Sequence, residues 1–440
     1  MASVTKDDRW RLLPQLTLTC LGIGIYGNEW LYVANVPVRV VQLLRAVAFL
    51  GFSMLALNYG AFFLPGIPRY IRDWLYPCIT VYLAVLMTGK LIGFHTSASP
   101  WVYFSLGQAL ICGFIGCRIG QTPHAAEWTL KMLARAAAVL SVYKFLTPEP
   151  LEGASFPPVG VGWPVQLFIL FGFCWYVSAA ISAPRPSKEM ILAASACVLE
   201  VFVAFHKPVV FAGLSSLVSL VLIEQFLPKR RERGSLRLIW GAGLLAIAMF
   251  AAFKVTGGVL LERYREEFFV KYLHMSANAS QGMFELDETT VERFSGGRFD
   301  LWSQAVDLFW KSPWVGSGPA QRFYSRGQEV HAHDGYLELL YSVGVVGALA
   351  HIGAAWIWLQ HTIFARGLAL RARLIIPIAA YIGGFLGYET GGGATALYTL
   401  LSFVYLLAGI ALGYSVGLQP VAQSSAGQRQ SVALRTRSQF

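Results

Sequence analysis

Charged residues are scarce in this chain of 440 residues, because Asp, Glu, Lys and Arg make up 13% of it. Soluble domains average roughly 25% charged residues. Hydrophobic residues reach 55% of the chain, and 14% of it is aromatic. These proportions exclude intrinsic disorder and disfavour a soluble globular domain. The composition indicates a polytopic membrane protein, whose main solvent is lipid.

Cysteine is also rare, with six residues in all, and each falls in or beside an apolar run. This distribution gives no sign of a disulfide framework or a zinc site. The sequence lacks an Asp-x-Asp metal motif, a GxxxxGK[ST] phosphate loop, an HExxH motif and a GxSxG elbow. Metal, nucleotide and serine-hydrolase mechanisms therefore lack support, and we expect neither a metal nor a cofactor.

Long apolar runs are abundant, and each run of about 16 to 25 residues is expected to form one membrane-crossing helix. About twelve such helices are predicted, which makes the fold class an all-α polytopic membrane protein. The predicted spans are 12–27, 38–57, 72–93, 101–118, 128–146, 163–181, 188–205, 208–226, 235–256, 336–361, 372–390 and 394–418. The first run lacks a cleavage site and is followed by further spans, so we do not interpret it as a removable signal peptide.

Positive charge in the short connections sets the expected orientation, because Lys and Arg are retained on the cytoplasmic side. Basic residues gather on one side of the predicted bundle, and we attribute the net charge of +11 to them and not to nucleic-acid binding. Both termini are then cytoplasmic, including a polar tail at 419–440 that is expected to be disordered. Transmembrane helices occupy 1–256 and 335–418, and one long outer loop occupies 257–334.

The outer loop contains 11 acidic and 8 basic residues and two stretches with helical spacing of apolar positions. Residues 259–275 and 299–311 are predicted to form amphipathic helices, which suit a position along the membrane interface. Pro313 and the glycines after it then break the chain before the next span. We expect function to reside in this loop.

The densest cluster of reactive side chains lies where the loop re-enters the membrane, at His331, His333, Asp334 and Glu338. Asp334 is expected to be the N-cap of the next helix. His333 is then beside the partial positive charge of a helix start, which favours the neutral imidazole that accepts a proton. The alternative is an interfacial histidine that only hydrogen-bonds the loop backbone.

Cationic side chains surround this cluster in the sequence, and arginine forks match the oxygens of a phosphate group. Arg298 and Arg322 are the preferred anion ligands, with Arg326 in the same loop and Lys207 at the outer end between two spans. The Gly-Ser-Gly at 316–318 is able to bring backbone N–H groups close to an anion, although a turn is the simpler interpretation. A solvated loop charge is the alternative for each arginine.

Charged residues within predicted spans are further candidates, since such a charge is costly unless it is paired or faces water. Arg45, Glu200 and Glu389 meet this criterion. Glu389 precedes three glycines at an outer helix end, where we expect it to face the same cavity as His333. A structural ion pair is the alternative for each.

Three runs in the second half of the chain resemble the signature of the O-antigen ligase and polymerase superfamily. They are GGRFDLW at 296–302, KSPWVGSGPAQRF at 311–323 and HAHDGYLELLYSVGVVG at 331–347. In that signature an arginine precedes a Leu-Trp helix, a proline and Gly-x-Gly turn follows, and His-x-His-Asn precedes Gly-x-x-Gly. His333 matches the functional histidine and Arg298 the arginine, whereas Asp334 departs from the usual Asn. Lys207 stands near a position where the family often has Ser-Arg.

The resemblance implies a GT-C-like, all-helical glycosyltransferase of the bacterial inner membrane, with its active site on the periplasmic face. Its donor is a glycan linked to undecaprenyl pyrophosphate, the ligase acceptor is the lipid A-core oligosaccharide, and no ATP or metal is required. His333 is then the general base on the acceptor hydroxyl, and Arg298, Arg322 and Lys207 hold the leaving pyrophosphate. Inversion at the anomeric carbon is expected.

The resemblance leaves an O-antigen polymerase and a protein O-oligosaccharyltransferase open, since both share the donor and the histidine-bearing outer loop. One arginine-rich outer loop, instead of two, favours the ligase. A lipid-linked glycan transporter or flippase is the alternative from another class, and it predicts charged residues near the bilayer midplane in broken helices of both halves. We find no clear inverted repeat in the sequence.

Overall fold

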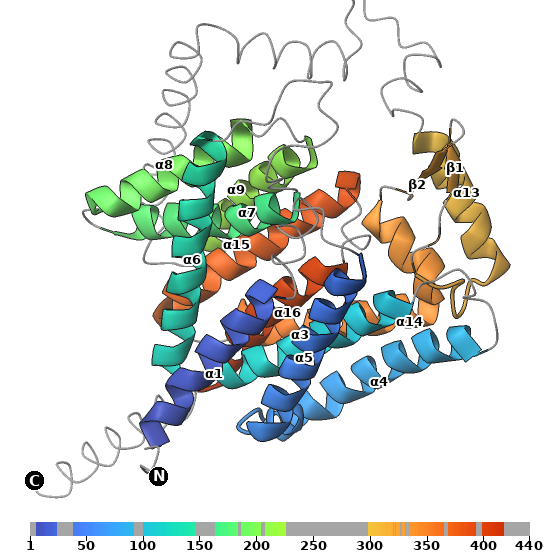
Figure 1. Ribbon diagram of the computed structural model, residues 1–440, viewed down its shortest axis with the longest axis horizontal. Helices are drawn as coiled ribbons and strands as arrows, with labels where there is room; N and C mark the ends of the chain where they lie inside the picture. Colours follow the sequence, from blue (N-terminus) through green and yellow to red (C-terminus); the bar gives the residue numbers. More distant parts are fainter. Residues whose placement is uncertain are drawn as a thin grey trace, which may run out of the picture.

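The computed structural model is a bundle of helices with one small β-hairpin (Figure 1). The structure describes residues 6–23, 38–91, 100–146, 163–183, 186–203, 207–225, 298–319, 321, 323–325, 328–330, 332, 334–364, 368–392 and 398–417.

The first third of the chain is helical in its described parts. Its helices are α1 (Lys6–Leu21), α3 (Val38–Asn58), the 3₁₀ turn η2 (Ala61–Phe63), α4 (Arg69–Leu91), α5 (Pro100–Gly120) and α6 (Pro123–Leu146). Pro100 and Pro123 begin their helices, where the missing N–H of proline breaks no helical hydrogen bond.

The rest of the chain adds further helices and two strands of three residues each. They are α7 (Trp163–Ser182), α8 (Lys188–Val203), α9 (Lys207–Gln225), α13 (Arg298–Lys311), β1 (Phe323–Ser325), β2 (Gln328–Val330), α14 (Gly335–Thr362), α15 (Leu368–Gly392) and α16 (Tyr398–Gly417). The strands pair antiparallel, with Phe323 opposite Val330. This short hairpin adds to the helices and leaves the predicted all-helical class in place.

The predicted spans coincide with helices of the structure, except for 235–256, which lies outside the described residues together with the predicted helix at 259–275. By length and composition, three of the described helices are able to cross a membrane, through Val102–Gly120, Val165–Ser182 and Gly335–Thr362. The helical, membrane-protein class is confirmed to that extent, and the count of twelve crossings stays a prediction.

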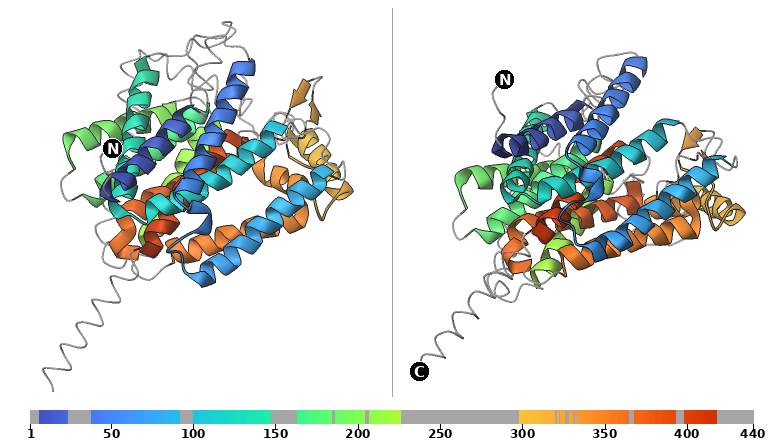
Figure 2. Two further views of the ribbon diagram at one scale, coloured as in Figure 1. Left: turned by 60° about the horizontal axis from the view of Figure 1, so that its bottom comes forward. Right: turned by 90° about the horizontal axis from the view of Figure 1, so that it is seen from below.

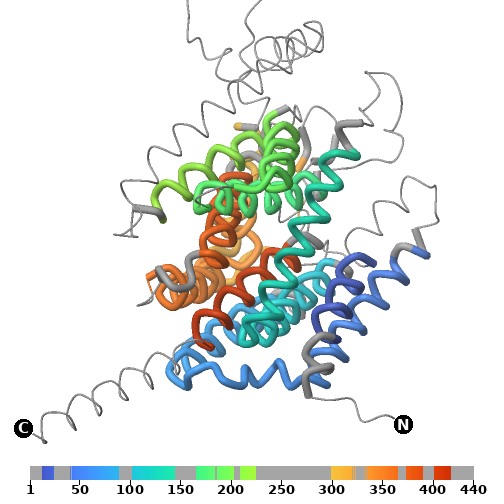
Figure 3. Tube along the Cα trace, turned by 90° about the vertical axis from the view of Figure 1, so that its left-hand side faces the viewer, coloured from blue at the N-terminus to red at the C-terminus, as the bar shows by residue number. Residues whose placement is uncertain are grey.

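The helices pack in long side-by-side pairs. The largest contacts join α16 to α5, α15 to α9, and α14 to α4, and Figure 2 shows α14 running alongside α4. In Figure 3, α7, α8 and α9 (green) gather on one side of the bundle, α4 (blue) lies on the opposite side, and α15 and α16 lie between them.

Glycines allow the backbones of α5 and α16 to touch. A Cβ on Gly116 would overlap the carbonyl oxygen of Leu406, and a Cβ on Gly413 would overlap that of Cys117. Small residues of this kind allow helices to pack closely within a bilayer, where van der Waals contact replaces the hydrophobic effect. We call this contact the glycine seam, formed by Gly116, Gly120, Gly409 and Gly413.

Serines of α9 fill the space that glycines leave on α15. Gly383 faces Ser219, whereas Gly387 faces Ser215. Because higher numbers on α15 meet lower numbers on α9, the two helices run antiparallel. Lys207, the first residue of α9, therefore lies toward the carboxyl end of α15.

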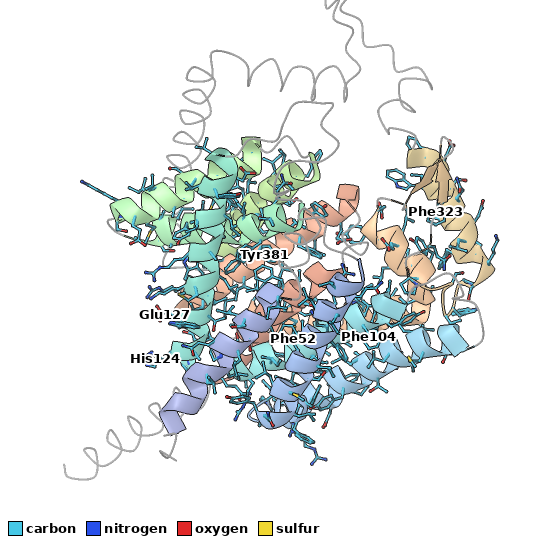
Figure 4. All side chains as sticks on the ribbon, viewed as in Figure 1. Phe52, Phe104, His124, Glu127, Phe323 and Tyr381 are labelled. Carbon is cyan, nitrogen blue, oxygen red and sulfur yellow. The ribbon has the colours of Figure 1, made fainter. Side chains whose placement is uncertain are left out.

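Aromatic side chains fill the core where α7, α15 and α16 meet. The Phe171 and Tyr381 rings are 5.9 Å apart, Tyr381 and Phe403 are 5.5 Å apart, and Phe171 and Phe403 are 5.7 Å apart, all edge to face. Each of these side chains is fully buried, and Figure 4 shows Tyr381 in the interior of the bundle. Edge-to-face pairs add about 0.5–1.5 kcal/mol to the burial of the rings, so this core fixes α15, which carries Glu389.

Candidate functional site

Helix α14 is interrupted at Gly344, which has a φ of 62° and a ψ of −172°. The N–H groups after the interruption find partners in the segment that follows α13. Val345 donates to the Pro313 carbonyl at 2.8 Å, and Val346 donates to the Trp314 carbonyl at 3.2 Å. A side chain on Gly344 would overlap the Trp314 backbone. This position therefore requires glycine both for its backbone angles and for space.

The carbonyl groups before the interruption are paired with the same segment. The Ser317 N–H donates to the Tyr341 carbonyl at 2.6 Å, and the Gly318 N–H donates to the Ser342 carbonyl at 3.1 Å. Irregular backbone within an apolar helix is tolerated when protein groups satisfy it in this way. We call this contact, between residues 313–318 and 341–346, the clasp.

The clasp occupies the backbone N–H groups that the sequence offered to an anion. The Gly316 N–H donates to the Ser312 carbonyl at 2.9 Å, and the N–H groups of Ser317 and Gly318 donate to α14. All three donors of the Gly-Ser-Gly stretch are therefore satisfied within the protein. The interpretation of this stretch as a turn is confirmed, and an anion-binding loop does not fit it.

Helix α13 anchors the segment that leads into α14. The indole Nε1–H of Trp302 donates to the Ala332 carbonyl at 3.2 Å. Ala332 is fully buried in an apolar cluster whose other members come from α13, β1 and α14. Since Ala332 separates His331 from His333 in the sequence, α13 fixes the backbone midway between the two histidines.

Asp334 is the N-cap of α14, as predicted. Its carboxylate accepts a hydrogen bond from the Leu337 N–H at 2.8 Å. Glu338 lies one turn into the helix and is only 1% exposed. A carboxylate buried so deeply is costly unless nearby groups compensate its charge. The partial positive charge at the start of α14 is one source of that compensation.

Glu389 reaches the same corner of the molecule from α15. It is 6% exposed, and a Cβ on Gly335 would overlap its carboxylate, so this carboxylate lies directly against the first residue of α14. The hydroxyl of Tyr336 donates to the Leu386 carbonyl at 3.0 Å and joins the same two helices. Glu389 therefore lies against the start of α14, and a cavity shared with His333 stays a prediction, since His333 lies outside the described residues.

The two cations predicted on helices occupy first positions. Lys207 begins α9, toward the end of the bundle where α15 carries Glu389. Arg298 begins α13, one turn before Trp302. The remaining predicted site residues lie outside the described residues: Arg322, Arg326, His331 and His333.

Large apolar side chains cover the outward surface of α13 and the turn after it. Phe299 is 47% exposed, and Trp310 and Trp314 are each 68% exposed. Aromatic residues favour the membrane–water interface, and Figure 1 shows α13 at the edge of the bundle. The amphipathic helix predicted at 299–311 is confirmed, and its position along a membrane interface stays a prediction.

Arg45 and Glu200, the other charges predicted within spans, belong to α3 and α8. Arg45 is partly buried, and Glu200 is 7% exposed. Among the described residues, His, Cys, Asp and Glu form no cluster of three or more that is able to hold a metal ion.

The family model described as O-antigen ligase matches residues 167–352. Over this stretch the chain is similar to the O-antigen ligase family. The stretch runs from α7 into α14 and contains the clasp, α13 and both histidines, and the resemblance seen in the sequence is confirmed over it. Glu389 lies beyond its end. The comparison with curated proteins gives no match.

The family is a glycosyltransferase-like superfamily of ligases and polymerases, so the match supports an enzyme that uses lipid-linked glycans and membrane lipids in general. Together with the apolar helices, the match indicates an inner-membrane protein.

Trp302 and Gly335 belong to the region where α13, α14 and α15 meet, and no pattern in the sequence singled them out. Trp302 carried a usable signal, because a tryptophan on the apolar face of an amphipathic helix needs a partner for its N–H when it is buried. Gly335 directly follows the N-cap, and no turn at that position requires glycine. Its small size serves the contact with Glu389, which the sequence does not reveal.

Proposed function

We propose that this protein is an O-antigen ligase, which transfers a glycan from undecaprenyl pyrophosphate to the lipid A-core oligosaccharide on the periplasmic face. The observation that carries the proposal is the hydrogen bond from Trp302 to Ala332, midway between His331 and His333 and two residues before the N-cap of α14. A histidine held on such a fixed backbone suits a reaction that needs a positioned base. The family match over the same residues supports the assignment.

In this proposal His333 is the general base. The neutral imidazole takes the proton of the acceptor sugar hydroxyl while the hydroxyl oxygen attacks the anomeric carbon of the donor. The bond from that carbon to the pyrophosphate oxygen breaks, and undecaprenyl pyrophosphate leaves with the electron pair. Attack opposite the leaving group inverts the anomeric carbon. The leaving group is already an anion stabilised by two phosphates, so the step needs no ATP and no metal.

Three carboxylates near the start of α14 are suited to stabilise the imidazolium that this proton transfer forms. Once His333 holds the proton it is a cation, and Asp334, Glu338 and Glu389 belong to the helices that meet beside it. A nearby negative charge favours an imidazolium. We assign these three residues a supporting role and place none of them on the phosphate.

The leaving pyrophosphate requires positive charge, which we assign to Arg298, Arg322 and Lys207, with Arg326 and His331 nearby in the chain. Arg298 and Lys207 begin α13 and α9, where the partial positive charge of each helix start adds to that of the side chain. Arg322 and His331 are the covalent neighbours of Phe323 and Val330, which face each other in the hairpin.

The proposed topology has about twelve crossings in a GT-C-like arrangement, with transmembrane helices at 1–256 and 335–418. The loop at 257–334 is periplasmic, and both termini are cytoplasmic, including the tail at 419–440. Every predicted span among the described residues coincides with a helix, which supports this arrangement.

The deciding experiment incubates the purified protein with lipid-linked glycan and lipid A-core, without nucleotide and with a chelator. Glycan attached to lipid A-core, detected by gel mobility and mass spectrometry, is the expected product. Lengthening of the lipid-linked glycan would instead identify a polymerase. Movement of the lipid-linked glycan across a proteoliposome membrane, without either product, would identify a transporter and overturn the proposal.

A further inference from the structure

A second charged site lies at the opposite end of the bundle from α13 and the hairpin. A cavity of about 190 Å³ opens there between α6, α7, α8 and α15. Figure 4 labels Glu127 beside this region and Phe323 at the far end of the molecule. We call it the cationic pocket, and the lining residues that matter are Lys131, Arg135, Trp175, Tyr176, Glu189 and Arg373.

Two cations of the pocket are held in place by one carboxylate. Glu127 accepts from the Lys131 ammonium at 2.9 Å and lies 3.3 Å from the Arg373 guanidinium, so it ties α6 to α15. The hydrogen bond from Lys131 and the nearby charge of Arg373 hold the pKa of Glu127 below its usual range. Glu127 is therefore ionised at neutral pH and draws the two cations toward the same carboxylate.

Arg135 adds a third cation, one turn along α6 from Lys131. It is exposed to solvent and, in the described part of the chain, has no ion-pair partner. Glu127 and Glu189 together offset two of the three positive charges, which leaves an excess of one. The guanidinium of Arg135 is thus able to donate its paired N–H groups to an incoming anion.

The floor of the pocket is aromatic and belongs to a helix that is able to cross the membrane. Trp175 and Tyr176 are each 8% exposed on α7, whose residues Val165–Ser182 form a candidate span. Trp and Tyr favour the headgroup level of a bilayer, where one end of the ring is apolar and the other is hydrated. Beside this floor, α8 presents Ile191 and Leu192, which are 48% and 72% exposed, so a ligand of the pocket has an outward apolar surface next to it.

We propose that the cationic pocket binds the phosphate group of an anionic phospholipid. The phosphodiester lies against Arg135, Lys131 and Arg373, and the acyl chains leave along α8, past the exposed side chains of Ile191 and Leu192. Basic pockets between transmembrane helices on the cytoplasmic side bind phosphate-bearing headgroups in this way. The volume is about six times the roughly 30 Å³ that a water molecule occupies in the liquid, which is enough for a phosphate and a few attached atoms. The proposal is independent of glycan transfer, because this end carries none of the residues assigned to that reaction.

The test compares lipid retention by the full-length protein in nanodiscs and after detergent extraction. We expect native mass spectrometry to show phosphatidylglycerol retained about ten times more than phosphatidylcholine at equal supply. Arg135→Gln should abolish the preference, and Arg135→Lys should restore part of it, because lysine keeps the charge but not the fork. The matched control is Arg69→Gln, which removes an exposed arginine paired with Asp73 on α4 and should retain phosphatidylglycerol as wild type does.

Competition with excess inorganic phosphate distinguishes a lipid ligand from free phosphate, since both carry a phosphate group. If phosphatidylglycerol stays bound, the lipid is the ligand, and if phosphate displaces it from wild type, the pocket recognises the phosphate group itself. Both outcomes support a phosphate site. Equal retention of the two lipids by wild type, or no loss in Arg135→Gln, would overturn it.

Discussion

In both the glycine seam and the clasp, glycines lie against the backbone of another segment, but the two contacts have different structural roles. In the glycine seam, Gly116 and Gly413 lie within regular helices and simply let α5 and α16 approach. In the clasp, Gly316 and Gly344 have positive φ angles, and Gly344 interrupts α14. The seam therefore sets the distance between two helices. In the clasp, the interruption of α14 leaves backbone groups without helical partners. These groups bind residues 313–318 and so fix the segment that leads to the histidines.

The difference predicts that changes near the clasp reduce activity while the protein stays folded, whereas changes in the seam reduce the amount of folded protein. His333→Ala tests the first half and has the largest expected effect. A positioned general base contributes about 10²- to 10⁴-fold, so glycan transfer should fall by that factor while membrane abundance stays that of wild type. Full transfer by this variant would remove His333 from the mechanism.

Arg298→Ala tests the same half of the prediction, in which activity falls while the protein stays folded. Hydrogen bonds to charged groups are worth about 1.5–3 kcal/mol, so kcat/KM for the lipid-linked donor should fall about 10- to 100-fold. Arg298→Lys should recover only part of this loss, since lysine cannot bind two phosphate oxygens in a fixed fork. Donor-dependent kinetics on both variants provide the measurement, and equal rates for both variants and wild type would make Arg298 a bystander.

Gly116→Ala tests the seam. The new methyl group would overlap the Leu406 carbonyl, and overpacking of this kind costs about 1–3 kcal/mol. We expect lower membrane abundance and a lower thermal midpoint, with unchanged activity per folded molecule. Gly113→Ala is the matched control on the same helix, because its Cβ meets the Tyr405 carbonyl at an ordinary 3.6 Å. If both variants are equally stable, backbone contact in the seam is not what limits this helix pair.

Trp302→Phe probes the anchor between α13 and the histidine segment. The substitution keeps an aromatic ring beside Phe299, whose centroid lies 5.4 Å from that of Trp302, and removes the donor to the Ala332 carbonyl. A neutral hydrogen bond contributes about 0.5–1.5 kcal/mol, so transfer should fall up to about tenfold. Trp310→Phe, at a position 68% exposed, should leave transfer unchanged. Equal rates for the two variants would mean that the anchor does not position the histidines.

Side-chain patterns were enough to predict the local features of this corner. Spacing of apolar residues located α13, and an acidic residue before an apolar run located the cap at Asp334. The clasp was beyond such reasoning, because its hydrogen bonds join backbone groups and leave no side-chain signature apart from the glycines. The contact of Glu389 with Gly335 depends on how α15 packs against α14. The sequence separates these residues by more than fifty positions, and no local pattern encodes that packing.

The smallest effect is expected at Asp334, whose carboxylate has two separable roles. It caps α14, and it carries a negative charge next to His333 in the chain. Asn is as good an N-cap as Asp, so Asp334→Asn should keep the thermal midpoint, whereas Asp334→Ala should lower the free energy of unfolding by about 1 kcal/mol. Loss of the negative charge disfavours the protonated imidazole. The acid limb of the rate profile of Asp334→Asn should therefore move to lower pH, by a fraction of a unit. A profile identical to that of wild type would mean that Asp334 acts on the helix alone, and that the family's usual Asn and this Asp are equivalent at this position.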